Sequence, residues 1–449
     1  MSSAVEIRDS RGMSACEADV LVVGGGAAGV AAAVTAARQG VGVVLLERYG
    51  FCGGGAVAGM SGTICGMYEA SDDTSAPPKQ VVHGFLDEFV GAMERRDGLT
   101  PPVRYGKTFT RVHDPLAWRE TADDLLMQAG VRVFLHTTVI DVMTEAPDRI
   151  AGVVAYTKQG RLEVRAKITI DASGDADVVA MAGLPTLIGQ EGRVQNPTMI
   201  FRLQGVDVAR FLASYGNDSI MGDEVSKTIQ RLDRGNEYRL PRSKVFLFPS
   251  PRRNELLCNC TRIVGRDGRE LNPLLVEDIT EAEIEGRRQV REYARFFRDY
   301  LRGCEESFVN DTGVQVGVRQ TRQVKGARLL TNEEVTAGAK FDSGIARSPW
   351  PIELHSGEKP RLVWLLNDYY EVPYECFVPE TGESLLVAGR CLSAEHEAMA
   401  SARVTAQCFS YGHAIGHAAA MAVQENISPR AVPAEEIRRR LNSDGARLD

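Results

Sequence analysis

The chain has 449 residues and a formal net charge of -8, and 44% of its residues are hydrophobic. This composition is typical of a globular protein with room for two or three domains, and the acidic balance argues against a general affinity for nucleic acid or an anionic membrane. Nine cysteines without a C-x-x-C pair argue against a disulfide scaffold, a zinc site and an iron–sulfur cluster, so we expect no metal.

The first 18 residues are polar and lack the apolar core of a signal peptide, so we expect residues 1–18 to form a flexible tail. No later apolar segment has the length and the freedom from charge that a membrane span requires. With the scattered free cysteines, these features predict a cytoplasmic protein in a reducing compartment.

Residues 19–48 have the pattern of a nucleotide-binding βαβ unit. An apolar run leads into Gly24, Gly26 and Gly29, which fit G-x-G-x-x-G, and an alanine-rich helix follows. A second apolar run ends at Glu47, where an acidic side chain can accept hydrogen bonds from ribose hydroxyls. The order of strand, glycines, helix, strand and acid predicts a dinucleotide site. The alternative is a glycine-rich turn in an ordinary α/β domain.

The next segments indicate further backbone contact with a flat ligand. Glycines crowd residues 50–55, and small residues dominate residues 56–66. Helices are expected around 81–95 and 115–130, the second with Asp114 as its cap.

From residue 131 the apolar pattern changes to alternation, which predicts three or four short strands, a β-meander inserted in the nucleotide fold. The meander ends at Asp171 and is followed by the small-residue turn 172–177. This turn is a second place where backbone could approach the same cofactor.

Residues 185–340 have longer alternating strands and a helix near 277–302, and are expected to form a mixed α+β substrate domain. Residues 341–360 are rich in proline and glycine and are expected to be an irregular loop. A buried strand at 384–388 and a long helix at 404–423 then return the chain to the first domain. The predicted boundaries are 19–184, 185–340 and 341–425, with a C-terminal tail or helix at 426–449.

Five motifs together resemble those of a family of bacterial FAD-dependent oxidoreductases within the glutathione-reductase-like flavoprotein superfamily. They lie at Gly24–Gly29, Glu47–Gly54, Asp171–Asp177, Gly317–Arg322 and Leu385–Val404. The last, LLVAGRCLSAEHEAMASARV, is the most specific. The resemblance implies an α/β fold with FAD as cofactor: a Rossmann-like FAD-binding domain interrupted by the substrate domain.

The resemblance also implies cofactor contacts for residues in several segments. Those expected at the pyrophosphate and the adenosine are Gly24, Gly26, Ala28, Gly29, Glu47, Arg48 and Val139. Those expected along the ribityl chain, the pyrophosphate and the flavin are Cys52, Gly53, Gly54, Asp175, Gly389 and Arg390. Cys52 could be a redox partner or a covalent flavin ligand, or only a small buried apolar residue.

Four residues are candidates for the chemistry. His396 could exchange a proton near neutral pH, or could only hold its turn by hydrogen bonds. Glu397 could orient His396, and Arg403 could hold a substrate oxygen or the FAD phosphates. In GVRQTR, alternation sends one of Arg319 and Arg322 inward, where a guanidinium needs an anion or forms a structural ion pair.

The remaining histidines are weaker candidates. His355 and His113 lie in segments that could cover the flavin, whereas the other four follow the faces of predicted elements and are expected to be structural. No second G-x-G-x-x-G is present, so a built-in nicotinamide site is not expected.

The expected function is an FAD-dependent oxidoreductase that transfers a hydride between a small organic substrate and flavin N5. One alternative is a redox-neutral isomerase or hydratase, and another is a flavin-binding electron-transfer or RNA-modification partner. The expected partners are a small substrate and an unknown electron acceptor, with no nucleic acid and no membrane. The sequence leaves open whether the protein forms a homo-oligomer.

Overall fold

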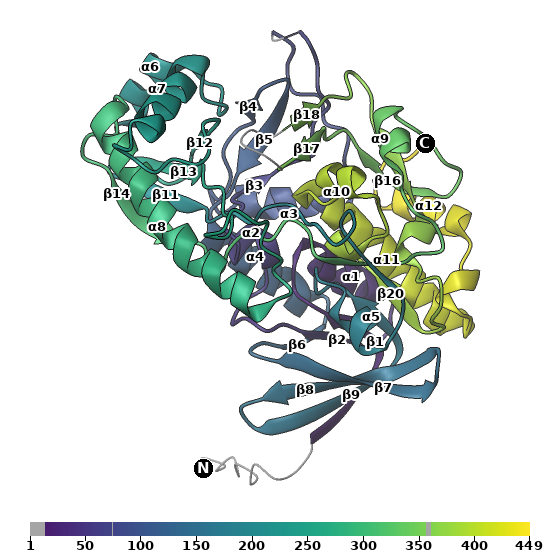
Figure 1. Cartoon of the computed structure of the whole chain (residues 1–449). Coiled ribbons are helices and arrows are strands. Elements are labelled where there is room, and N and C mark those ends of the chain that lie inside the picture. The colour runs from purple at the N-terminus through teal and green to yellow at the C-terminus, as the bar shows by residue number, and fades with distance from the viewer. Residues whose placement is uncertain (1–13, 74, 356–360) are drawn as a thin grey trace, which may run out of the picture.

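A computed structural model describes residues 14–73, 75–355 and 361–449. Its central sheet has parallel strands in the order β6-β2-β1-β9, and β20 joins the sheet beside β9 (Figure 1). The bounds of these strands are β1 Ser14–Val23, β2 Val43–Leu46, β6 Arg132–Phe134, β9 Gly160–Asp171 and β20 Leu385–Val387. The strands β2 and β20, residues 20–23 of β1 and the end of β9 are buried and mostly apolar because both faces of the sheet are covered there.

Strand β1 begins at Ser14, so residues 14–18 are strand and not part of a tail. They pair with residues 162–166 of β9, which is the physical reason that polar residues here are ordered. Residues 1–13 of the expected tail lie outside the described residues.

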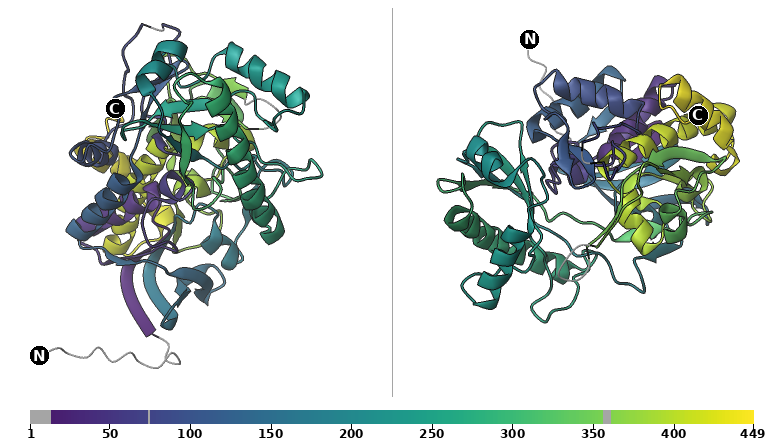
Figure 2. Two further views of the ribbon diagram at one scale, coloured as in Figure 1. Left: turned by 90° about the vertical axis from the view of Figure 1, so that its left-hand side faces the viewer. Right: turned by 90° about the horizontal axis from the view of Figure 1, so that it is seen from above.

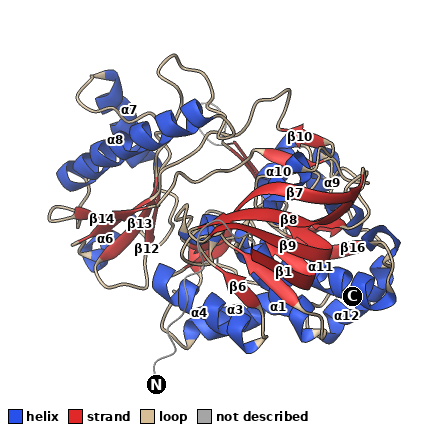
Figure 3. Ribbon diagram, turned by 90° about the horizontal axis from the view of Figure 1, so that it is seen from below, coloured by secondary structure: helices blue, strands red, loops and turns tan. Residues whose placement is uncertain are grey.

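The predicted meander is present. Strand β7 (Thr138–Ala146) pairs antiparallel with β8 (Arg149–Thr157), and β8 pairs antiparallel with β9. Because β9 also runs parallel to β1, one strand joins the meander to the nucleotide-binding sheet. Figure 3 shows the meander strands continuing that sheet, with α1, α3, α4 and α12 along one side.

The helices that cover the sheet include α1 (Ala27–Arg38) and the long α11 (Thr405–Glu425). They pack closely because α11 presents glycines to α1: a Cβ at Gly412 would lie 2.0 Å from the Ala28 carbonyl oxygen. The expected helices at 81–95 and 115–130 are α3 (Phe85–Glu94) and α4 (Pro115–Gln128). Asp114 caps α4 by accepting from two backbone N–H groups, as its sequence predicts.

The second domain has its own antiparallel sheet, in the order β12-β13-β11-β14, and its own hydrophobic core from Met199 to Val316. Figure 2 shows it as a separate lobe beside the nucleotide-binding domain. Its elements are β11 Phe201–Gln204, β12 Phe246–Pro249, β13 Glu255–Asn259, β14 Phe308–Thr312, α6 Val208–Tyr215, α7 Asp223–Arg234 and α8 Val276–Tyr300.

Two strands, β10 (Thr186–Ile188) and β15 (Arg322–Val324), pair antiparallel where the chain passes between the domains. Beyond β15, Leu330 and Val335 already pack in the first core, so the chain returns before residue 340.

The segment expected to be an irregular loop contains two strands, β16 (Gly344–Ser348) and β17 (Ile352–Leu354). They pair with β19 (Tyr370–Pro373) and β18 (Arg361–Val363). Their apolar residues are buried in the first core, and this tertiary packing overrides the local proline and glycine content. Residues 356–360 of the expected loop lie outside the described residues.

The remaining elements are short or terminal. They are α2 Gly54–Val57, β3 Thr63–Ile64, β4 Val103–Tyr105, β5 Thr108–Val112, α5 Asp177–Met181, α9 Asn332–Thr336, η1 Tyr374–Phe377, η2 Gly389–Cys391, α10 His396–Ala402, η3 Pro429–Ala431 and α12 Ala434–Ser443. Asp444, after α12, accepts hydrogen bonds from His413 and His417 of α11 and so ties the C-terminal segment to the core. No helix within the described ranges has the length and apolarity to cross a membrane.

Candidate functional site

One cavity begins at the turn between β1 and α1. Gly24 has φ +101°, and a Cβ there would lie 2.5 Å from the Ala172 carbonyl oxygen. Gly26 caps the N-terminus of α1 and lines the cavity with Ala28, so the unpaired N–H groups of that helix face it. Gly29 does not line the cavity: a Cβ there would lie 1.8 Å from the Gly24 carbonyl oxygen, so this glycine is needed for packing and not for ligand contact.

The end of β2 forms the next part of the wall. Glu47 is buried and accepts hydrogen bonds from the backbone N–H groups of Gly25 (2.7 Å) and Tyr49 (2.8 Å). Burial raises the pKa of Glu47, although these hydrogen bonds oppose the shift. Arg48 and Val139 also line the cavity.

The turn after β9 packs beside the glycine loop, and its two acids, Asp175 and Asp177, have different positions relative to the cavity. Asp175 does not line the cavity; its carboxylate accepts from Arg390 Nη2 (2.9 Å) and from the Thr321 hydroxyl (2.6 Å). It therefore anchors Arg390, which lines the cavity with Gly389. The acid that lines the cavity is Asp177, whose pKa burial and the neighbouring Asp175 raise to about 6.

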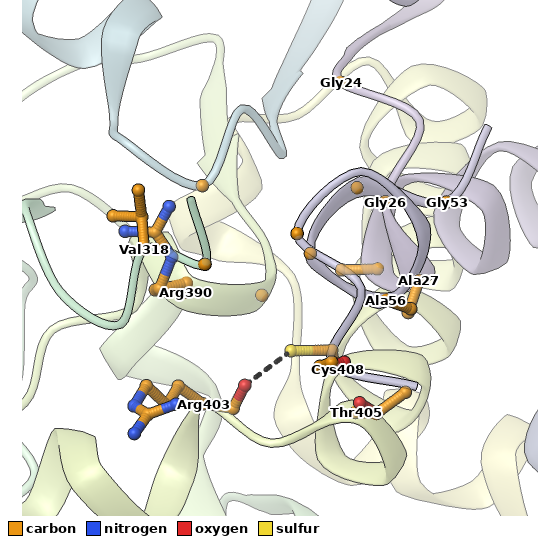
Figure 4. A pocket seen from close by; sticks show the side chains of 18 of the residues that line it. Gly24, Gly26, Ala27, Gly53, Ala56, Val318, Arg390, Arg403, Thr405 and Cys408 are labelled. Atoms are coloured by element: carbon orange, nitrogen blue, oxygen red, sulfur yellow. Dashed lines mark hydrogen bonds between the residues drawn. The ribbon is translucent and has the colours of Figure 1, made fainter. Parts of the chain in front are cut away.

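The next part of the cavity wall is the turn at residues 53–54, whose backbone lies close to that of the glycine loop. Gly53 and Gly54 line the cavity, and a Cβ at Gly54 would lie 2.9 Å from Gly26 Cα. The N-terminus of α11 contributes Thr405 and Cys408 on another side. Figure 4 shows Gly24 and Gly26 on one side of the cavity, with Arg390 and Arg403 across from them.

Cys52 does not belong to this wall. Its side chain is fully buried behind the glycine loop, where a Cβ at Gly25 would lie 2.6 Å from its sulfur. Burial raises the pKa of the Cys52 thiol, so the thiolate needed for a redox or covalent role is disfavoured. The position of Cys52 outside the cavity lining therefore favours the small apolar alternative.

The far end of the cavity is a charged and aromatic chamber, which we define by Tyr105, Arg319, Trp350, Glu353, His355 and Arg403. Glu353 Oε1 accepts from the Tyr105 hydroxyl at 2.8 Å and lies 3.0 Å from His355 Nε2. The Tyr105 ring packs on Trp350, with centroids 5.2 Å apart.

The environment sets the charges of the acid and the imidazole in this chamber. Burial, and after it the charge of Arg319, lower the pKa of His355 to about 3, so its imidazole is neutral at pH 7. Burial would raise the pKa of Glu353, but His355, Tyr105 and Arg403 outweigh it and the pKa is about 2. A neutral imidazole therefore donates to an ionised carboxylate.

Of the four expected chemical residues, the structure brings two to the chamber. Arg319 is the inward member of GVRQTR, and Arg322 instead pairs with Asp177 at 2.5 Å. His396 and Glu397 do not line the cavity. The 3-10 turn η2 and α10 carry them past it, and Glu397 forms an ion pair with Arg361.

The chamber also contains His355, which the sequence analysis named only as a weaker candidate, and three residues that it did not select: Glu353, Tyr105 and Trp350. Glu353 and His355 are two positions apart on β17 and just after it, a spacing that puts both side chains on one face. Recognition of that strand in the proline-rich segment would have pointed to the pair. Tyr105 and Trp350 carried no local signal. His113 is buried against Trp118 and lies outside the cavity.

Comparisons with known proteins identify the family of this chain. A family model described as FAD dependent oxidoreductase matches residues 19–441. No curated protein matches the chain.

Two solved structures share the fold. A geranylgeranyl bacteriochlorophyll reductase-like protein from Thermoplasma acidophilum is 15% identical, with TM-score 0.51, over 96% of this chain and 83% of that one. A flavin-dependent brominase is 13% identical, with TM-score 0.51, over 95% and 84%. The extent of the family match shows that this chain belongs to the FAD-dependent oxidoreductases and uses FAD.

Proposed function

We propose that the enzyme transfers a hydride between a small organic substrate and N5 of FAD, with the substrate in the chamber. The observation that carries this proposal is the continuity of the cavity, which runs from the glycine loop at Gly24 to the His355–Glu353 pair. Bound FAD supplies a carrier for the hydride. The protein then has to hold the substrate and move a proton.

The cavity walls fit the cofactor in three places. Glu47 and Arg48 would hold the adenosine ribose, and the N-terminus of α1 with Arg390 would hold the pyrophosphate. The backbone at Gly53 and Gly54 would lie along the flavin, and the N-terminus of α11 would stabilise negative charge on it. These glycines fit a bulky ligand because side chains there would fill the space or strain the backbone.

The proton role is proposed for His355 in place of His396. His355 lines the cavity and is neutral at pH 7, so its ring has a nitrogen that can accept a hydrogen bond or a proton. Its lowered pKa makes it a weak base in the empty chamber, and an anionic substrate that neutralises Arg319 would raise this pKa. His355 Nε2 donates to Glu353, which leaves Nδ1 as the basic atom and puts a carboxylate beside the imidazolium that would form. His396 and Glu397 lie outside the cavity wall, so a structural role is proposed for both.

The test is an anaerobic titration of the purified, flavin-loaded enzyme with a panel of organic acids, alcohols, amines and alkenes. A substrate that bleaches the flavin without an added acceptor would support hydride transfer. A compound that is converted while the flavin stays oxidised would overturn it in favour of a redox-neutral isomerase or hydratase.

Further aspects are proposals from the sequence motifs and composition. They are membership of the glutathione-reductase-like branch among bacterial flavoproteins, a cytoplasmic location, a separate electron acceptor and the absence of nucleic-acid and membrane partners. The electron-transfer alternative would be favoured if a tight protein partner reduced or oxidised the flavin in the absence of a small substrate.

A further inference from the structure

The chamber and its surroundings contain an excess of buried positive charge. The charges of Arg242 and Arg403 both act on the Arg319 guanidinium, and the carboxylate that acts on Arg319 and Arg403 is Glu353. Arg242 and Arg319 are only 2% and 7% exposed. Glu353 is already engaged by Tyr105 and His355, and within the described ranges none of the three guanidiniums forms an ion pair with a carboxylate.

The arginines instead have neutral partners. Arg242 donates to the Asn259 amide oxygen (3.0 Å), and Arg319 donates to the Asn196 carbonyl (2.7 Å). Arg403 donates to the Gln195 amide oxygen at 3.2 Å, but its Nε is buried and has no partner among the described residues. Neutral acceptors satisfy single N–H groups but do not balance the charge, and a buried guanidinium without an anion is costly.

The arginine pKa values agree with this imbalance. Burial and the neighbouring Arg403 and Arg242 lower the pKa of Arg319, and burial lowers the pKa of Arg403 to about 10. Because arginine stays protonated in proteins, these shifts describe cations that are destabilised by their surroundings. An anion in the chamber would relieve both the desolvation and the mutual repulsion.

An apolar wall faces this charged part. Phe248 and Ile200 line the cavity with Tyr105 and Trp350, and the Tyr105 ring lies parallel to that of Phe248 with centroids 6.2 Å apart. A ligand that satisfies both parts has an anionic group at one end and a flat or apolar body at the other.

We propose that Arg319 and Arg403 bind the carboxylate of a small organic acid, whose apolar body packs on Tyr105, Trp350 and Phe248. This inference rests on the proposed function, because it names the substrate class of the same chamber. Each guanidinium can donate two parallel N–H groups to a carboxylate, so the site distinguishes an acid from its amide by charge as well as by shape.

The experiment compares matched acids and amides as ligands of the flavin-loaded enzyme, in a buffer free of carboxylate and phosphate. Benzoate and cinnamate are titrated against benzamide and cinnamamide, and the perturbation of the flavin absorbance spectrum reports binding. We expect the acids to bind at least about 10-fold more tightly than the amides. Equal affinity, or no perturbation by either acid up to about 10 mM, would overturn the proposal.

Variants then connect the affinity to the arginines. Arg403→Met and Arg319→Met should each weaken acid binding about 10- to 100-fold and leave amide binding unchanged, and Arg403→Lys should fall between Arg403→Met and the native enzyme. Arg149→Gln, which removes an exposed partner of Glu145, is the matched control and should bind acids as the native enzyme does.

The flavin content of each variant separates the possible failures. If the arginine variants lose FAD while Arg149→Gln retains it, the guanidiniums serve the cofactor and the acid proposal is wrong. If the native protein binds no flavin, the proposed function fails instead. Circular dichroism and thermal melting confirm that each variant is folded, and Arg403→Lys tests the charge requirement if a methionine variant is not.

Discussion

The two ends of the cavity are built in different ways. The nucleotide end comes largely from one stretch, residues 24–48, and it presents mainly backbone and glycines to the cavity. The chamber is assembled from Tyr105, Arg319, residues 353–355 and Arg403, which belong to separate parts of the chain. A site that recognises its ligand through backbone groups requires a continuous sequence motif. A site built from side chains of distant segments leaves little recognisable pattern in the sequence.

The largest expected effect is the loss of stability caused by substitution of Gly29, a residue that packs behind the nucleotide end of the cavity without lining it. Gly29→Ala puts a Cβ 1.8 Å from the Gly24 carbonyl oxygen, so the strand and helix must separate. We expect a loss of at least about 4 kcal/mol in the free energy of unfolding, measured by urea denaturation. Gly91→Ala is the control, because its Cβ would meet only Arg95 at 3.7 Å; equal stability of the two variants would contradict the assignment.

At the chamber end, His355→Asn should lower kcat about 100- to 1000-fold while the enzyme keeps its flavin. The reason is loss of the proton acceptor beside Glu353. His396→Asn is the matched variant outside the cavity, and its turnover should stay within about 3-fold of native. If His396→Asn is the slower enzyme, the sequence-based assignment of the proton role is right and the present one wrong.

Gly26 tests ligand contact at the nucleotide end separately from folding. A Cβ there would meet only Gly54 Cα at 3.9 Å, so the folded protein accommodates Gly26→Ala. The methyl group would crowd the pyrophosphate, and we expect FAD affinity to fall about 10- to 100-fold with stability changed by less than about 1 kcal/mol. Fluorescence titration of the apoprotein with FAD measures this, and native affinity would remove Gly26 from the pyrophosphate site.

The stability of the folded protein should depend on pH through two buried histidines, His355 in the chamber and His417 outside it. Burial lowers the pKa of His355 to about 3 and that of His417 to about 4, from 6.5 in the unfolded chain. Between the folded and unfolded pKa values, each histidine binds more protons in the unfolded state than in the folded state. The stability that comes from keeping the histidine neutral is therefore complete above pH 6.5, and it is lost as the pH falls toward 4. We expect a loss of about 1–2 kcal/mol per histidine at pH 5.

Denaturation of the apoprotein from pH 8 to about pH 5 measures this slope. His417→Gln should make the slope shallower and leave FAD binding unchanged, because His417 does not line the cavity. A slope that is the same in His417→Gln and in the native protein would contradict the buried neutral state of this histidine.

The smallest effect is expected for Cys52. Because its side chain lies behind the glycine loop and not in the cavity, Cys52→Ala should keep FAD and a turnover within about 3-fold of native. The flavin of the native protein should be released on denaturation and pass an ultrafiltration membrane. Flavin that stays with the denatured chain in the native protein, but not in Cys52→Ala, would restore the covalent role.

Many of the residues at the nucleotide end could be predicted from the sequence. Gly24, Gly26 and Glu47, which the glycine spacing and period of a βαβ unit single out, all line the cavity. Arg48, which the family resemblance adds, lines it too. Asp175 was selected in place of Asp177 because spacing alone does not show which acid of a tight turn is held by Arg390.

Only some of the chamber residues could be predicted from the sequence. Arg319 and Arg403 were selected as guanidiniums that need an anion, and both line the cavity. Glu353 was hidden in a segment whose proline and glycine content predicted a loop. His396 was favoured because it follows the motif at Gly389, but helix α10 carries its side chain away from the cavity wall.

The sequence by itself determined the βαβ unit, the meander and the return of the chain through α11, because hydrophobic period and glycine spacing act over short distances. FAD as the cofactor followed from the resemblance of five motifs to a flavoprotein family. Only the tertiary structure decided which charged side chains meet. The Glu353–His355 pair, Tyr105 and the two arginines come together because segments far apart in the chain pack around one cavity. Burial there, which no local pattern encodes, sets their charges.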